Sequence, residues 1–148
     1  MRRTIHALLI ASVAIIGSAC DESLSSIAGP TPNLTPEFAS IQLHVFADGD
    51  SSGRRACVAC HNARQAAFVA GLILEGDDAY ERLVNAPSRN KPGAILVVPG
   101  NAEASYLIHK VEGRPEIAGL RMPFNGPYLS DGQIAILKRW INIGAPRN

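Results

Sequence analysis

The stretch that decides the fold of this chain is Cys57-Val58-Ala59-Cys60-His61. Two cysteines separated by two residues and followed at once by a histidine form the signature of covalent c-type haem attachment. Each thiol can add across one vinyl group of the porphyrin, and the neighbouring imidazole can then reach the iron from one face. The pattern predicts one covalent haem c, bound through Cys57 and Cys60, with His61 as an iron ligand.

A scarce residue type indicates the second iron ligand. The chain has two methionines, and Met122 is the one that follows the start methionine. A lone methionine is usually core filler, but this one lies in the loop segment RMP (121–123), far enough from His61 for the chain to circle a haem. The sequence therefore predicts His/Met ligation, which raises the reduction potential. His109 is the main alternative to Met122 as the sixth ligand. His44, on an earlier helix, is a similar alternative.

Two other roles of a Cys-x-x-Cys pair fit this sequence less well. A structural zinc site needs four ligands, and the folded part offers only His44, His61 and His109 beyond the two thiols. Because His61 follows Cys60 directly, bringing both to one tetrahedral ion with Cys57 would be strained. A thioredoxin-like pair needs a strand–helix–strand setting, which the sequence does not indicate.

The beginning of the chain predicts an exported, lipid-anchored protein. Residues 1–19 combine a basic head, the apolar run ALLIASVAII and small residues, which is the layout of a secretory signal peptide. Cys20 follows Gly-Ser-Ala and resembles the lipobox of bacterial lipoproteins, so we expect it to be lipidated. Ordinary cleavage after Ala19, leaving a free thiol, is the alternative. Residues 20–35 are rich in Ser, Thr, Pro and Gly, which predicts a disordered tether on the periplasmic side of a bacterial membrane.

Length and charge restrict the class of protein further. Residues 36–148 suit a single domain with one core. The chain has 14 basic and 13 acidic side chains without a long run of one sign, so nothing indicates nucleic acid as a partner. No nucleophile or acid–base constellation is apparent, and we therefore expect no enzymatic activity.

Hydrophobic periodicity predicts an all-α domain of about five short helices, with long loops wrapped around one haem. In chain order the helices are expected from Thr35-Pro36 to the turn cluster at 48–53, at the cysteine motif, from Asp77 to Val84, from Asn101 to Gly113 and from Ser130 to Gly144. Ser130 and Gln133 form a capping-box pattern at the start of the last helix. The loops at 86–100 and 113–129 are rich in proline and glycine, and such long loops in a small domain indicate a functional role.

These features resemble a class I c-type cytochrome over roughly residues 36–146. The resemblance rests on a first helix with Phe46, the CVACH motif, a late Met-Pro loop and a last helix with Trp140. The stretches VVPGN (97–101), SYLIHK (105–110) and WINIGAP (140–146) are similar to bacterial cytochrome-c-like domains. The resemblance implies that the first and last helices cross and pack, with Phe46 and Trp140 at the crossing.

The imidazole of His61 needs a second contact. Its other ring N–H is expected to donate to a backbone carbonyl, which fixes the ring and tunes the iron. Pro99 or a residue near Pro87 are the candidates for that carbonyl. The Gly-Pro-x-Leu segment that often follows the haem helix in the resembled family is not found in this sequence.

The sequence as a whole predicts an exported monohaem electron carrier. Single electrons would pass between redox partner proteins by Fe(III)/Fe(II) cycling, with His61 and Met122 both retained as ligands. One alternative is a haem-based sensor or gas-binding module, which requires a displaceable sixth ligand. Another is an accessory haem subunit of a larger exported complex.

Overall fold

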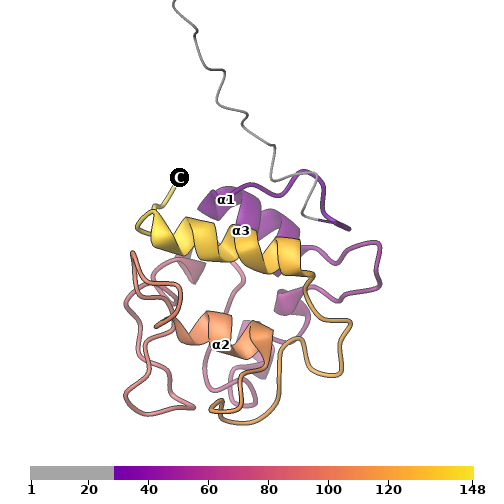
Figure 1. Ribbon diagram of the computed structural model, residues 1–148. Coiled ribbons are helices and arrows are strands. Elements are labelled where there is room, and N and C mark those ends of the chain that lie inside the picture. The colour runs from indigo at the N-terminus through magenta and orange to yellow at the C-terminus, as the bar shows by residue number, and fades with distance from the viewer. Residues whose placement is uncertain (1–28) are drawn as a thin grey trace, which may run out of the picture.

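The computed structural model describes residues 29–148, which form short helices joined by long loops (Figure 1). Helices α1 and α3 lie at one end of the domain, α2 lies beyond α3, and loops enclose the rest. The elements are α1 (Phe38–Ile41), its π-helical continuation η2 (Gln42–Ala47), the 3-10 turns η3 (Cys57–Ala59), η4 (Ala63–Gln65) and η5 (Asp77–Ala79), α2 (Tyr106–Glu112) and α3 (Asp131–Asn142).

Little of the remaining chain is regular. Within residues 29–148, β pairing is limited to isolated bridges between Val84 and Val97 and between Pro87 and Ile95. The helix predicted from Asp77 is reduced to the single turn η5, after which the chain continues in turns. Over the same described range, no helix has the length and apolar character needed to cross a bilayer.

The segment that precedes α1 is part of the folded domain. Cys20 and the secretory leader lie outside the described residues, but Leu34 is fully buried. The Thr31 hydroxyl accepts a hydrogen bond from Gln133 Nε2 at 2.6 Å. The prediction of a disordered tether is therefore wrong for residues 29–35, because an apolar side chain and a buried hydrogen bond attach this segment to the domain.

The start of the first helix differs from its prediction. The free N–H groups of Phe38 and Ala39 donate to the side-chain and backbone oxygens of Asn148, both at 3.0 Å. Asn148 thus satisfies donors that a helix start leaves unpaired, a role predicted for Thr35. The predicted end is confirmed, since Asp48 follows η2 in an extended conformation.

The other two helices follow their sequence signals closely. Ser130 and Gln133 form the predicted capping box, with Ser130 Oγ accepting from Gln133 N at 3.2 Å and Gln133 Oε1 accepting from Ser130 N at 2.8 Å. Helix α2 ends as predicted at Gly113, which is left-handed with φ 75°. It begins later than the predicted cap Asn101, and Ser105 is its N-cap.

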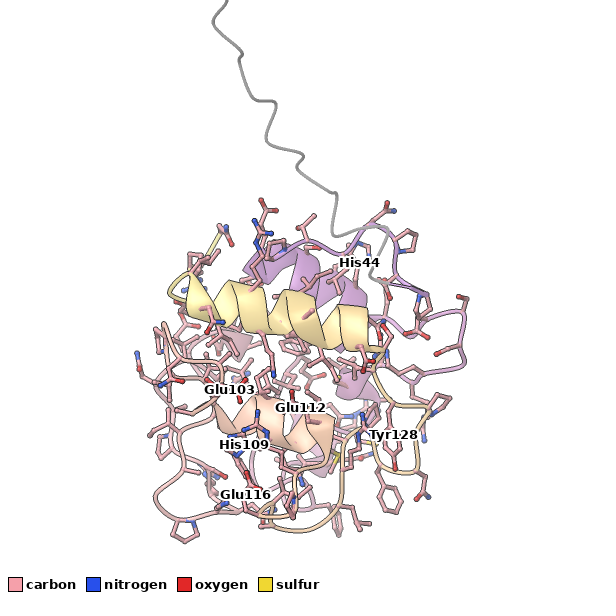
Figure 2. The ribbon with its side chains drawn as sticks, viewed as in Figure 1. His44, Glu103, His109, Glu112, Glu116 and Tyr128 are labelled. Atoms are coloured by element: carbon pink, nitrogen blue, oxygen red, sulfur yellow. The ribbon has the colours of Figure 1, made fainter. Side chains whose placement is uncertain are left out.

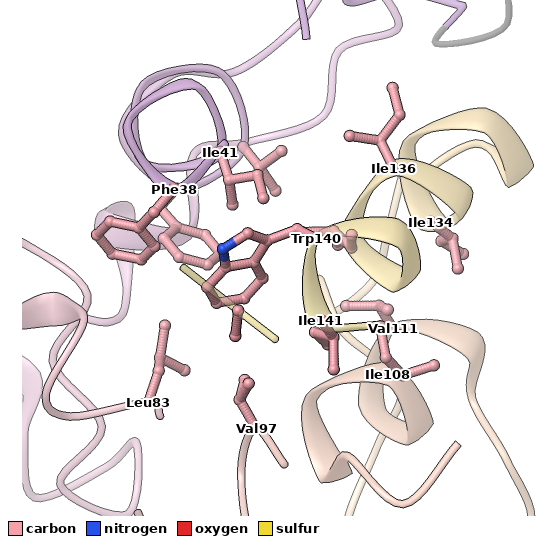
Figure 3. Close-up of a cluster of buried hydrophobic side chains, with 14 of the residues drawn as sticks. Phe38, Ile41, Leu83, Val97, Ile108, Val111, Ile134, Ile136, Trp140 and Ile141 are labelled. Carbon is pink, nitrogen blue, oxygen red and sulfur yellow. The ribbon is translucent and has the colours of Figure 1, made fainter. Parts of the chain in front are cut away.

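The main core lies around Trp140, between α1 and α3 (Figure 3). Trp140 is fully buried, and its Nε1 donates to the carbonyl of Pro146 at 3.0 Å. The ring centroid of Phe38 lies 5.7 Å from that of Trp140. Phe38 therefore supplies the aromatic contact predicted for Phe46, which is buried but lines a separate cavity. Further members of the cluster are Ile41, Leu83, Val97, Ile108, Val111, Ile134, Ile136 and Ile141.

A buried arginine joins the end of η2 to the cysteine motif. The side chain of Arg54 is fully buried, and its Nε lies 2.8 Å from the Asp50 carboxylate. Its two terminal nitrogens donate to the carbonyls of His44 and Val45 at 3.0 Å and of Asp48 at 3.1 Å. One side chain thus satisfies carbonyls at a helix end, where intrahelical partners run out.

Helix α3 shares the partner of this arginine. Gln133 Nε2 donates to the Asp50 carboxylate at 2.9 Å, and Ser52 N donates to it at 3.0 Å. Burial opposes ionisation, but hydrogen bonds from Ser52, Gln133 and Arg54 hold the pKa of Asp50 well below its usual range. The buried charge is therefore fully paired, as burial of a carboxylate requires.

We predict that Arg54→Met lowers the free energy of unfolding by about 3 kcal/mol, since removing one partner leaves a buried carboxylate uncompensated. Urea denaturation of the full chain measures the change. Arg64→Met is the matched control, because Arg64 is exposed and such substitutions usually cost less than about 0.5 kcal/mol. Equal losses in the two variants would contradict the role given to Arg54.

Candidate cofactor-binding site

One cavity brings together residues that are far apart in the sequence. It has a volume of about 710 Å³ and is lined mainly by apolar side chains, within the roughly 300–1,000 Å³ typical of cofactor sites. Cys57, Cys60, His61 and Met122 all lie on its wall. The fold thus gathers around one cavity the four residues that the sequence predicts to hold a haem.

The cysteine motif presents both thiols from one tight turn. In η3 and the residues after it, the N–H groups of Cys60 and His61 both donate to the carbonyl of Cys57, at 3.1 and 2.8 Å. The thiol of Cys57 lies 3.3 Å from the carbonyl of Val45, close to the end of η2. The two cysteines are free thiols, so both sulfurs are available for bonds to a cofactor.

The carbonyl that orients His61 is that of Leu72. Nδ1 of His61 lies 3.0 Å from this oxygen, and the His61 carbonyl accepts from Leu74 N at 2.9 Å. A proton on Nδ1 leaves the Nε2 lone pair available as a metal ligand. Burial lowers the pKa of His61, which favours this neutral form. The predicted carbonyls, Pro99 or a neighbour of Pro87, do not fill this role.

The Cys57 thiol is poorly suited to redox exchange. Burial raises the pKa of Cys57 to about 11, although the charge of Arg54 opposes this shift. Cysteines that attack disulfides are thiolates with lowered pKa values, so this environment disfavours a thioredoxin-like role. Within residues 29–148, no group of three His, Cys, Asp or Glu side chains is arranged to hold a metal ion.

The loop that carries Met122 is attached to the end of α2. Met122 N donates to the carbonyl of Lys110 at 2.9 Å, and Nε of Arg121 donates to that of Val111 at 2.8 Å. These oxygens belong to the last turn of the helix, where carbonyls lack intrahelical partners. Gly113 makes the approach possible, since a Cβ at this residue would lie 2.6 Å from Cδ of Arg121.

The alternative histidine ligands lie elsewhere. His109 is not among the residues that line the cavity, and Figure 2 shows it near Glu103 and Glu116. Its Nε2 lies 2.7 Å from the carbonyl of Glu103, and its Nδ1 lies 3.1 Å from the carboxylate of Glu116, outside hydrogen-bonding angles. His44 is on η2 and is also absent from the cavity wall. This placement favours Met122 over either histidine.

The charges on the wall are one-sided. Among the described residues, the cavity is lined by four cationic side chains and by no carboxylate; the four are Arg55, Arg82, Arg89 and Lys110. The sequence did carry a signal for Lys110. It lies on the same face of α2 as Tyr106, Leu107 and Val111, which line the cavity with it. Two thiols, an imidazole, a thioether, apolar walls and cationic side chains without a carboxylate among them all fit an iron porphyrin, which is flat, apolar and carries two carboxylates.

No known family model, curated protein or solved structure matches the chain. The chemistry of the cavity must therefore be judged from its own residues.

We predict that Gly113→Ala destabilises the protein by at least about 1 kcal/mol more than Gly93→Ala. Both glycines have positive φ, so a side chain strains each. Nothing lies within 4 Å of a Cβ at Gly93, whereas one at Gly113 meets the base of the Arg121 side chain, and such overpacking costs about 1–3 kcal/mol. Thermal unfolding of the two variants measures the difference, and equal melting temperatures would contradict the predicted overpacking.

Proposed function

We propose that residues 36–148 form a monohaem c-type cytochrome that transfers single electrons between redox proteins. The observation that carries this proposal is that one apolar cavity is shared by the thiols of Cys57 and Cys60, the imidazole of His61 and the thioether of Met122. Covalent attachment would use the two thiols, and the iron would be held by His61 and Met122. A haem bound there would supply reversible one-electron Fe(III)/Fe(II) exchange.

The contacts of His61 and Met122 support the proposal of an electron carrier whose two ligands would be permanent. His61 is fixed by the Leu72 carbonyl at 3.0 Å, and Met122 is fixed through its own N–H by the Lys110 carbonyl at 2.9 Å. Pro123 limits the backbone directly after the methionine. Ligands held in this way change position little between oxidation states, so electron transfer requires little rearrangement of the protein.

The cellular location proposed here rests on the leader. The apolar run before Cys20 favours export, which c-type haem attachment requires, and the small residues before Cys20 favour lipidation on the periplasmic side of a bacterial membrane. The mass of the mature exported protein tests both modifications together. We expect one haem in the wild type and none in Cys57→Ser/Cys60→Ser, with the lipid lost only in Cys20→Ala. A wild-type mass without added haem would reject the proposed function.

We predict that Met122→Ala lowers the midpoint potential and removes the weak far-red absorption of oxidised Met-ligated haem, since loss of the thioether ligand lowers the potential. His109→Ala is the control, because His109 is bound to Glu103 away from the cavity, and it should leave both properties unchanged. Visible spectra and a redox titration measure them. If His109→Ala changed the potential and the far-red absorption while Met122→Ala left both unchanged, His109 would be the sixth ligand.

Carbon monoxide tests whether the sixth ligand is permanent. We expect reduced wild-type protein to bind the gas slowly or not at all, and reduced Met122→Ala to bind it rapidly, because only the variant offers an open position. Stopped-flow mixing followed in the visible spectrum measures both rates. Rapid binding by the wild type would instead indicate a sensor or gas-binding module.

A further inference from the structure

We infer that Arg89, together with Ser88 and Asn90, binds a carboxylate of the cofactor in the cavity. The inference rests on the proposed function and assigns a residue-level contact within it. All three side chains line the cavity, and they are consecutive in the chain. An iron porphyrin carries two carboxylates on an otherwise apolar ring, and a carboxylate in an apolar cavity requires a cationic partner.

Four cations line the cavity, and only Arg55 and Arg89 among them have side chains without a partner in residues 29–148. Arg89 is the one flanked on the wall by two further donors, Ser88 and Asn90. Lys110 donates to the carbonyls of Ala118 and Leu120, and Arg82 is paired with Asp78 at 2.9 Å. Within residues 29–148, the Arg89 side chain has no hydrogen bond or ion pair. Its planar guanidinium suits a carboxylate, which it can bind through two parallel hydrogen bonds.

The neighbours of Arg89 supply further donors. Ser88 is 8% exposed, and its Oγ accepts from Lys91 N at 3.2 Å, so its hydroxyl proton remains free to donate. Asn90 uses one amide proton on the carbonyl of Ala118 at 3.4 Å, which leaves the other. Lys110 donates to the same carbonyl at 2.9 Å. A strip of donors therefore runs along the wall from Arg89 towards α2.

Glycine at position 71 lets Arg89 lie beside the loop that supports His61. A Cβ on Gly71 would lie 2.2 Å from Nη1 of Arg89, so the guanidinium packs directly on this backbone. The next residue, Leu72, provides the carbonyl bound to the imidazole. A carboxylate held by Arg89 would therefore lie close to the loop that orients His61, where its charge would affect the reduction potential.

The test is the pH dependence of the reduction potential of isolated holoprotein between pH 5 and 8. A nearby cation lowers a carboxylate pKa by about 1–3 units, so we expect the carboxylate of the wild type to be ionised throughout and the potential to be flat. In Arg89→Gln the ionisation constant of the carboxylate should fall at least about tenfold, which raises its pKa. Its deprotonation then favours Fe(III), and the potential should fall as pH increases. Arg89→Lys should restore most of the flat profile.

Other ionisable groups on the wall need controls. The side chains concerned are Arg55, Arg82, Lys110 and Tyr106. The imidazole of His61 also lines the cavity, and its Nδ1 is bound to the Leu72 carbonyl. Arg64→Gln, an exposed arginine off the cavity wall, should match the wild type. Burial lowers the pKa of Lys110, so Lys110→Gln is added to Arg89→Gln. If the pH dependence then disappears, the amine is the titrating group and the inference is rejected.

Several further outcomes would reject the inference. A profile for Arg89→Gln that coincides with the wild type, or a shift in Arg55→Gln but not in Arg89→Gln, would overturn the assignment while leaving the proposed function intact. If Arg89→Gln does not fold, Asn90→Ala should give a smaller shift in the same direction, and an unchanged profile would reject the inference. A wild-type mass without haem rejects both the proposed function and this inference.

Discussion

The buried pair of Arg54 and Asp50 fixes the cysteine motif relative to the helices around it. The guanidinium satisfies the carbonyls at the end of η2, and the carboxylate is shared with Gln133 of α3. Cys57 follows three residues later, and its thiol lies against the Val45 carbonyl that Arg54 also contacts. The Arg54–Asp50 pair can stabilise the fold because both charged groups have their hydrogen-bond partners. A buried charge that lacks such partners would destabilise it.

Helix α3 also determines where Met122 lies, by way of α2. Lys138 of α3 contacts the carboxylates of Glu103 and Glu112 at 2.8 and 2.6 Å, and Arg114 contacts the same two carboxylates. Hydrogen bonds to these cations lower the pKa of Glu103 to about 2. Because the last carbonyls of α2 hold the methionine loop, α3 is connected to both sides of the cavity, through Asp50 to the cysteine motif and through α2 to Met122.

Local signals predicted best what depends on local contacts. The capping box at Ser130 and the end of α2 at Gly113 follow from side-chain chemistry within one helical turn, and the structure has both. The predictions of Thr35 as the cap of α1 and of Phe46 as the aromatic contact of Trp140 were wrong. Asn148 and Phe38 take these roles, and only the tertiary fold brings them there. Leu72 was missed for a similar reason, since a backbone carbonyl carries no signal in the sequence. Met122 and the cysteine motif line the same cavity. The separation of the two in the sequence allowed this arrangement but did not require it.

The supports of the two proposed ligands differ in kind, and this difference has a consequence for tuning. The Leu72 carbonyl acts on the imidazole ring itself, so it affects the basicity of His61 as a ligand as well as its orientation. The Lys110 carbonyl acts on the backbone of Met122 and leaves the sulfur untouched, so it affects position alone. In the proposed cytochrome, changes in the loop around Leu72 would therefore adjust the reduction potential with both ligands retained. Changes at the end of α2 would act mainly by strengthening or weakening the bond to the methionine.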